Sequence, residues 1–179
     1  MADKGGDRIM ELKNRSQYLD KLISVQDMEV IKVVTGIRRC GKSSLLKLMM
    51  VHLREQGVME EQILSMNFES MQFADMDSKR LYQYVMERAP KGKRLYLFLD
   101  EVQKVRDWQD AVNSFRVDLD CDIYVTGSNA YLLSSELSTY LSGRYVEIKI
   151  CLLYTSPYNQ RNRSRPAPPL PRGSAATAS

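Results

Sequence analysis

The chain has 179 residues, of which 44% are hydrophobic and 27% are charged, as is typical of a globular protein with a buried core. It contains no run of about 18 apolar residues, and its first residues lack the apolar stretch of a secretory signal, so the sequence excludes a membrane span and predicts a cytoplasmic protein. Three cysteines without paired spacing and a single histidine, His52, exclude a disulfide scaffold and a histidine-rich metal site.

The net charge of +4 comes from the C-terminal tail. Four of the 26 basic residues are arginines within residues 151–179, a stretch that holds no acid, and the remaining 22 equal the 22 acidic residues of the body. The body is therefore charge-balanced. It lacks the overall basic footprint of a nucleic-acid-binding protein, although a local basic patch stays open.

Short apolar runs alternate with helical patterns along residues 29–150, which we expect to form one core domain. A polar lead-in with a short helix at 15–23 occupies residues 1–28. The expected strands cover residues 30–34, 63–68, 95–99, 122–126 and 145–150, and the expected helices cover residues 43–56, 78–89, 108–119 and 131–141. Because the strands are continuously apolar, we expect an α/β three-layer sandwich with a central parallel sheet of about five strands.

Residues 151–179 differ in kind from the rest of the chain. They contain five of the six prolines and show no apolar period, so we expect disorder. The junction CLLYTS at 151–156 resembles the in-frame translation of an adapter used in sequencing libraries, and on that interpretation the native chain ends near Ile150. The alternative is a genuine Pro/Arg-rich tail that binds a partner.

The first motif, at residues 36–43, fits the phosphate-binding pattern G-x-x-x-x-G-K-[ST] between a predicted strand and a predicted helix. Its glycines allow close approach of the backbone, and its N–H groups and the helix start favour an anion. Lys42 is expected to reach the β- and γ-phosphates of a nucleotide, and the Ser43 hydroxyl to bind Mg²⁺. A structural glycine loop is the alternative. The expected nucleotide-binding residues are Gly36, Ile37, Arg38, Arg39, Cys40, Gly41, Lys42, Ser43 and Ser44.

Two acids, Asp100 and Glu101, directly follow the apolar run 95–99. A strand that ends in acids presents them at the carboxyl edge of a parallel sheet, beside the phosphate loop. We expect Asp100 to hold Mg²⁺ and Glu101 to orient and deprotonate an attacking water. Alone they could be two surface acids. Together with the loop, and with the extra strand 63–68 between the motifs, they resemble the P-loop ATPases with an additional strand and a catalytic glutamate.

Two further positions carry candidate catalytic roles. Ser128 and Asn129 closely follow the expected strand 122–126. There a hydroxyl or amide near the γ-phosphate could position water, as at the sensor-1 position of AAA-type ATPases. The alternative is an N-cap for the next helix, and the two residues could divide these roles. Arg144 directly precedes the last strand, where an arginine of AAA-type ATPases often reaches the γ-phosphate of a neighbouring subunit. Its alternative is a structural salt bridge.

Four segments together resemble one family. GIRRCGKSSLL (36–46), LFLDEVQKVRDWQ (97–109), YVTGSNAYLLSSEL (124–137) and LSGRYVEIKI (141–150) are similar to the bacterial and archaeal AAA-domain ATPases of the AAA_14 group, which carry a C-terminal partner domain of unknown function, DUF4143. The resemblance covers about residues 8–150. Members continue beyond the last strand into that domain, whereas this chain departs from the pattern at Cys151, so we expect the partner domain to be missing.

The resemblance implies binding of ATP with Mg²⁺, hydrolysis of ATP, and an oligomer in which Arg144 reaches a neighbour. It does not name a substrate for the ATPase cycle. A second hypothesis is a nucleotide-gated binding or signalling switch, DNA-linked or defence-linked, that hydrolyses ATP little or not at all. The presence of Glu101 favours the ATPase, because a protein that only binds nucleotide needs no catalytic base.

Overall fold

The computed structural model describes residues 16–128, 141 and 143–151, and these form an α/β sandwich. An N-terminal helix has its described part at residues 16–24. In chain order the other principal elements are β1 (Ile31–Gly36), α2 (Lys42–Glu55), β2 (Ile63–Asn67), α3 (Ser78–Met86), β3 (Leu95–Asp100), α4 (Trp108–Asp118), β4 (Cys121–Ser128) and β5 (Tyr145–Ile150).

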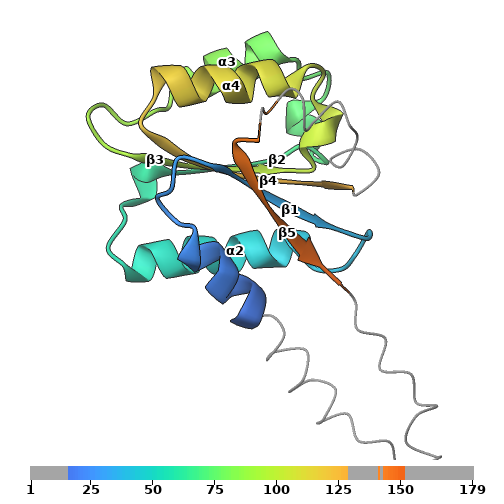
Figure 1. Ribbon diagram of the computed structural model, residues 1–179. Coiled ribbons are helices and arrows are strands. Elements are labelled where there is room, and N and C mark those ends of the chain that lie inside the picture. The colour runs from blue at the N-terminus through green and yellow to red at the C-terminus, as the bar shows by residue number, and fades with distance from the viewer. Residues whose placement is uncertain (1–15, 129–140, 142, 152–179) are drawn as a thin grey trace, which may run out of the picture.

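The sheet has the strand order β2-β3-β4-β1-β5, and every neighbouring pair is parallel. This confirms the expected α/β fold with a parallel sheet. Because the strands share one direction, β1, β2, β3 and β4 all end at the same edge (Figure 1). β4 lies between β1, which leads into the phosphate loop, and β3, which leads into the two acids.

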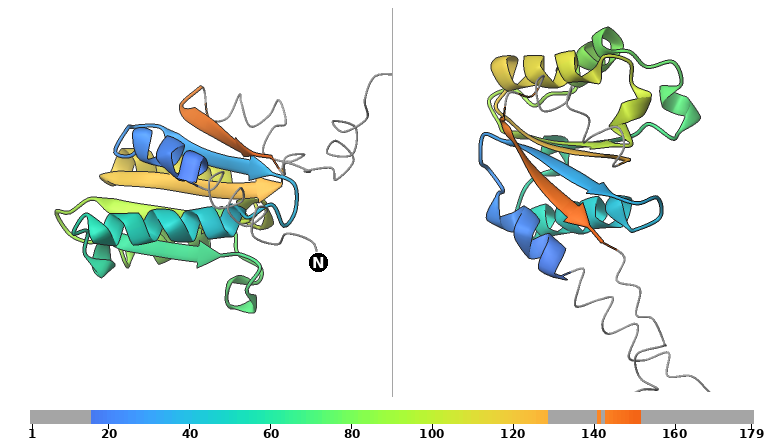
Figure 2. Two further views of the ribbon diagram at one scale, coloured as in Figure 1. Left: turned by 90° about the horizontal axis from the view of Figure 1, so that it is seen from below. Right: turned by 45° about the vertical axis from the view of Figure 1, so that its right-hand side comes forward.

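Helices cover both faces of the sheet. Figures 1 and 2 show α3 and α4 on one face, and α2 with the N-terminal helix on the other. Two separate groups of buried side chains fill the two interfaces, one around Trp108 and Phe115 of α4 and the other around Leu45 and Met49 of α2. β1 and β3 are buried along their whole length, which explains why the apolar residues of β3 run continuously over 95–99 rather than alternating.

The boundaries differ from the sequence-based prediction by one to three residues. α3 ends at Met86 rather than at residue 89, one turn ahead of Pro90, which lacks the N–H that would bond to the Met86 carbonyl in a continued helix. The expected extra strand 63–68 is β2, but in the sheet it is β4 that separates the two motif-bearing strands. The expected helix at 131–141 and the tail beyond residue 151 lie outside the described residues, apart from Leu141. None of the helices in the described ranges is long and apolar enough to cross a bilayer.

A buried ion pair joins the neighbouring strands β1 and β4 near the amino edge of the sheet. The ammonium group of Lys32 on β1 contacts the carboxylate of Asp122 on β4, and both side chains are fully buried. Asp122 also accepts hydrogen bonds from the Tyr124 hydroxyl at 2.8 Å and from the Asp27 N–H at 2.9 Å. Burial outweighs the attraction of Asp122 and lowers the pKa of Lys32 below its ordinary value. The same burial, with the nearby carboxylate, raises the pKa of Tyr124.

We predict that Asp122→Asn destabilises the fold by about 3–5 kcal/mol at neutral pH, because it leaves the buried Lys32 charge without the carboxylate that it contacts. The loss should shrink from pH 7 to pH 9. Asp122 raises the pKa of Lys32 against the effect of burial, so in the variant the folded protein releases this proton at lower pH, and stability rises more with pH than in the wild type. Denaturant unfolding at both pH values measures this. Glu60→Gln, which breaks an exposed ion pair with Arg54, is the control and should change stability little.

Candidate functional site

The phosphate loop occupies the turn between β1 and α2, where the sequence predicted it. Gly41 has φ of 96°, in the left-handed region that favours glycine, and it precedes the first turn of α2. The Cys40 N–H donates to the Ile37 carbonyl at 3.2 Å, which closes the loop on itself. The orphan N–H groups of the α2 N-terminus therefore face the same edge of the sheet as the loop, an arrangement suited to an anion.

Gly36 is needed for close packing rather than for its backbone angles. A Cβ at this position would lie 2.5 Å from the Cys40 sulfur and 2.8 Å from the carbonyl oxygen of Ile150 at the end of β5. The Cys40 side chain therefore fills the space that glycine leaves. The phosphate loop rests directly against the last residue of β5.

Lys42 begins α2, and its side chain is 5% exposed. Its ammonium nitrogen lies 3.4 Å from the carbonyl oxygen of Gly36 and 3.5 Å from that of Ile37. It also lies 3.6 Å from a carboxylate oxygen of Glu101. The structure thus brings the lysine of the phosphate loop and the second acid together across the intervening strand.

The two acids differ in their surroundings. Asp100 is the last residue of β3 and is 6% exposed, and its Oδ1 accepts a hydrogen bond of 2.5 Å from the Thr126 hydroxyl of β4. Glu101 has φ of 57°, which is unusual for a residue with a side chain, and it turns the chain away from the strand direction. Its Oε2 accepts a hydrogen bond of 2.6 Å from the Gln103 side-chain amide.

Sequence reasoning did not single out Thr126 and Gln103, although both contact the acids. Thr126 lies inside the segment YVTGSNAYLLSSEL, in which the candidate catalytic residues are the two that follow Gly127. Gln103 stood inside the quoted DEVQ segment. The signal for Thr126 is a hydroxyl at the end of a predicted buried strand, because a fully buried hydroxyl needs a hydrogen-bond partner.

The remaining predicted residues are placed as follows. Ser43 and Ser44 lie half-buried in the first turn of α2, whereas Ile37, Arg38 and Arg39 are exposed on the outside of the loop. The backbone of Ser128 pairs in register with Gly36, so the end of β4 lies beside the start of the phosphate loop. Asn129 lies outside the described residues.

Arg144 is not brought to this edge. It precedes β5, and the Ile31 N–H donates to its carbonyl at 3.0 Å, which places it where β1 begins rather than where β1 ends. At about 3.3 Å per residue, the length of β1 separates Arg144 from the phosphate loop of its own chain by roughly 20 Å. Its side chain is exposed.

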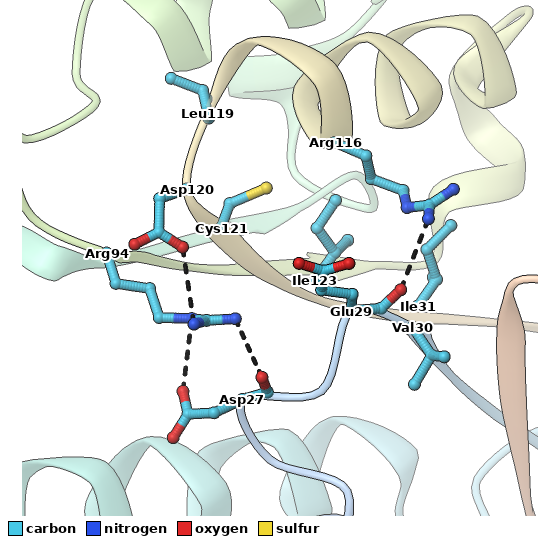
Figure 3. A pocket seen from close by; sticks show the side chains of 10 residues that line it. All are labelled: Asp27, Glu29, Val30, Ile31, Arg94, Arg116, Leu119, Asp120, Cys121 and Ile123. Atoms are coloured by element: carbon cyan, nitrogen blue, oxygen red, sulfur yellow. Dashed lines mark hydrogen bonds and ion pairs between the residues drawn. The ribbon is translucent and has the colours of Figure 1, made fainter.

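A pocket of about 360 Å³ also lies at the amino edge (Figure 3). Its arginines are already engaged within the protein. Arg94 lies between Asp27 and Asp120, at 3.3 and 3.5 Å, and Arg116 donates to the Glu29 carbonyl at 3.4 Å. These pairs hold together the start of β1 and the end of α4, and they lie at the opposite edge from the phosphate loop.

The donor set at the phosphate edge suits Mg²⁺ bound together with a phosphate. The described residues contain no cluster of three or more His, Cys, Asp or Glu side chains that could hold a metal by themselves. Mg²⁺ usually takes one or two carboxylates, with substrate phosphates and waters completing its shell. The buried carboxylate of Asp100 and the hydroxyl of Ser43 offer the hard oxygen ligands that such a site needs.

A family model described as "AAA domain" (AAA_14) matches residues 29–158. An uncharacterised protein of Haemophilus influenzae is 47% identical over 139 residues, which cover 76% of this chain and 35% of that protein. An uncharacterised protein of Methanocaldococcus jannaschii is 27% identical over 143 residues, covering 79% of this chain and 31% of that protein. The chain thus spans about a third of the length of these curated relatives.

Among solved structures, a DNA polymerase III gamma subunit-related protein of Thermotoga maritima superposes with a TM-score of 0.54. The match covers 75% of this chain and 46% of that one at 10% sequence identity. At this identity the likeness shows a shared fold.

Proposed function

The chain belongs to the AAA domain family, and on this premise we propose that it binds ATP with Mg²⁺ and hydrolyses the bond between the β- and γ-phosphates at the carboxyl edge of its sheet. In this proposal residues 29–150 form the ATPase core. The observation that carries it is the convergence of Lys42, from the phosphate loop, and Glu101, from the end of β3, at 3.6 Å.

The loop supplies the binding energy for the triphosphate. Backbone N–H groups at the start of α2 face the anion, and the Lys42 ammonium group contacts the β- and γ-phosphates. An incoming phosphate competes for Lys42 with the three protein oxygens that lie within 3.6 Å of it. Transfer of Lys42 to the phosphate would free the Glu101 carboxylate from its ion pair.

Glu101 then acts as the general base. Its carboxylate accepts the proton of a water that attacks the γ-phosphorus in line with the leaving group. Asp100 and Ser43 would hold Mg²⁺, which neutralises charge on the phosphate oxygens when bound. We propose that Ser128 and Asn129 position the attacking water, since the end of β4 lies beside the phosphate loop.

We predict that Lys42→Ala lowers ATP affinity by about 10- to 100-fold, because it removes a charged hydrogen-bond donor to the phosphates. Fluorescence titration with labelled ATP measures the affinity, and a thermal melt checks that the variant folds. Lys47→Ala removes an exposed lysine one turn further along α2 and should bind ATP normally. Equal affinities in the two folded variants would contradict the assignment of the loop.

We predict that Glu101→Gln still binds ATP with Mg²⁺ but turns it over about 10²–10⁴-fold more slowly, because the amide cannot accept the proton. Asp100→Asn should instead weaken binding only when Mg²⁺ is present. The two measurements are single-turnover ATPase rate and nucleotide affinity with and without Mg²⁺. Loss of binding alone in both variants would make Glu101 a metal-site acid. A wild-type chain that binds ATP without turnover would support the nucleotide-gated switch.

We propose that Arg144 acts on the γ-phosphate of a neighbouring copy, since it lies far from the phosphate loop of its own chain. Arg144→Ala should then abolish the part of the ATPase rate that grows with protein concentration, by up to about 10³-fold in an assembled oligomer. Arg88→Ala, at an exposed position two residues after α3, serves as the control. A concentration-independent wild-type rate would remove the role of Arg144 in a neighbour.

A further inference from the structure

The hydroxyl of Thr126 joins the two acids of the candidate site. Thr126 lies on β4, the strand between β1 and β3, and its side chain is fully buried. Its oxygen accepts a hydrogen bond from the Glu101 N–H at 3.0 Å and donates one to Asp100 Oδ1 at 2.5 Å. A peptide N–H can only donate, so the single proton of the hydroxyl must go to the carboxylate.

These two hydrogen bonds of the Thr126 hydroxyl lie where the regular pairing of β3 and β4 stops. The last pair in their register is Leu99 with Val125, which makes Asp100 and Thr126 the next opposed positions. There a side-chain hydroxyl takes the N–H of the following residue, Glu101, in place of a main-chain carbonyl. The hydrogen bond of the Thr126 hydroxyl therefore continues the pairing of β3 and β4 by one residue, into the candidate site.

Each of the two hydrogen bonds of the Thr126 hydroxyl has a geometric effect. On Asp100, fixing Oδ1 restricts rotation of the carboxylate and leaves its second oxygen for another ligand. On Glu101, the bond holds the peptide of a residue in the left-handed region, with φ of 57°. That conformation is costly for a residue with a Cβ and needs support from its surroundings. It is also the turn that places the Glu101 side chain beside Lys42.

We propose that Thr126 is a positioning residue that orients Asp100 toward the metal and Glu101 toward the attacking water through this one hydroxyl. The inference rests on the proposed function of the site and adds a residue to it. It predicts a coupled defect: loss of the hydroxyl weakens the Mg²⁺ dependence and the chemical step together, while binding of metal-free ATP stays intact.

The chain offers a matched control on the adjacent strand. Thr35 of β1 is also fully buried, and its hydroxyl also donates to a carboxylate at 2.5 Å, that of Glu147 on β5. Thr35 lies on the face of Val33, which packs against α3 and α4, whereas Thr126 lies on the face of Tyr124, toward α2. Thr35→Val thus removes the same chemistry from the opposite face.

The experiment compares Thr126→Val, Thr126→Ser and Thr35→Val in the full 179-residue chain. ATP affinity is titrated without metal and over a series of Mg²⁺ concentrations, and single-turnover hydrolysis is timed at saturating ATP. For Thr126→Val we expect unchanged metal-free affinity, an about 10-fold higher Mg²⁺ requirement and an about 10- to 100-fold slower step. Thr126→Ser, which keeps the hydroxyl, and Thr35→Val should behave as wild type.

The outcomes separate this inference from the proposed function. If Thr126→Val matches Thr35→Val in Mg²⁺ requirement and rate, the inference is wrong while the ATPase stands. If the wild-type chain fails to bind ATP, both are wrong. Should Thr126→Val not fold in a thermal melt, Thr126→Ala replaces it. Its difference from Thr126→Ser in Mg²⁺ requirement then decides the question, and equal values would overturn the inference.

Discussion

The spacing of parallel strands sets the geometry of the candidate site. β1 delivers the phosphate loop and β3 delivers the acids, but β4 lies between them. At about 4.8 Å between neighbouring strands, the two motifs start roughly 10 Å apart. That distance is too great for direct contact of short side chains. Lys42 and Glu101 cross it with long side chains, and Thr126 on β4 reaches the acids from the middle position.

The parts of the fold that depend on local pattern could be predicted from the sequence. The continuous apolar run 95–99 indicates a strand buried on both faces, and the glycine pattern at 36–43 predicts a phosphate loop because its chemistry is local. The order of strands is not local, so nothing in the residues placed β4 between the two motifs. For the same reason the partners of Thr126 and the distance of Arg144 from its own loop became apparent only in the assembled sheet.

The two edges of the sheet are built differently. At the amino edge, charges are matched within the protein, by the buried pair of Lys32 with Asp122 and by Arg94 between Asp27 and Asp120. At the carboxyl edge, the Lys42 ammonium group has only long contacts, of 3.4 to 3.6 Å, with two carbonyl oxygens and the Glu101 carboxylate. Lys32 also shows why a lysine inside a predicted strand need not be exposed: its partner lies 90 residues away.

The packing of Gly36 against Ile150 makes the end of β5 part of the floor beneath the phosphate loop. A side chain at this position would place its Cβ 2.8 Å from the carbonyl oxygen of Ile150, so any residue larger than glycine would require the backbone to shift. Because packed protein interiors are nearly incompressible, neither segment can shift inward without displacing the other. A shift of the end of β5 toward β1 would therefore press on the phosphate loop through steric contact. The absence of a single methyl group at Gly36 thus lets the candidate site and the end of β5 lie in direct contact.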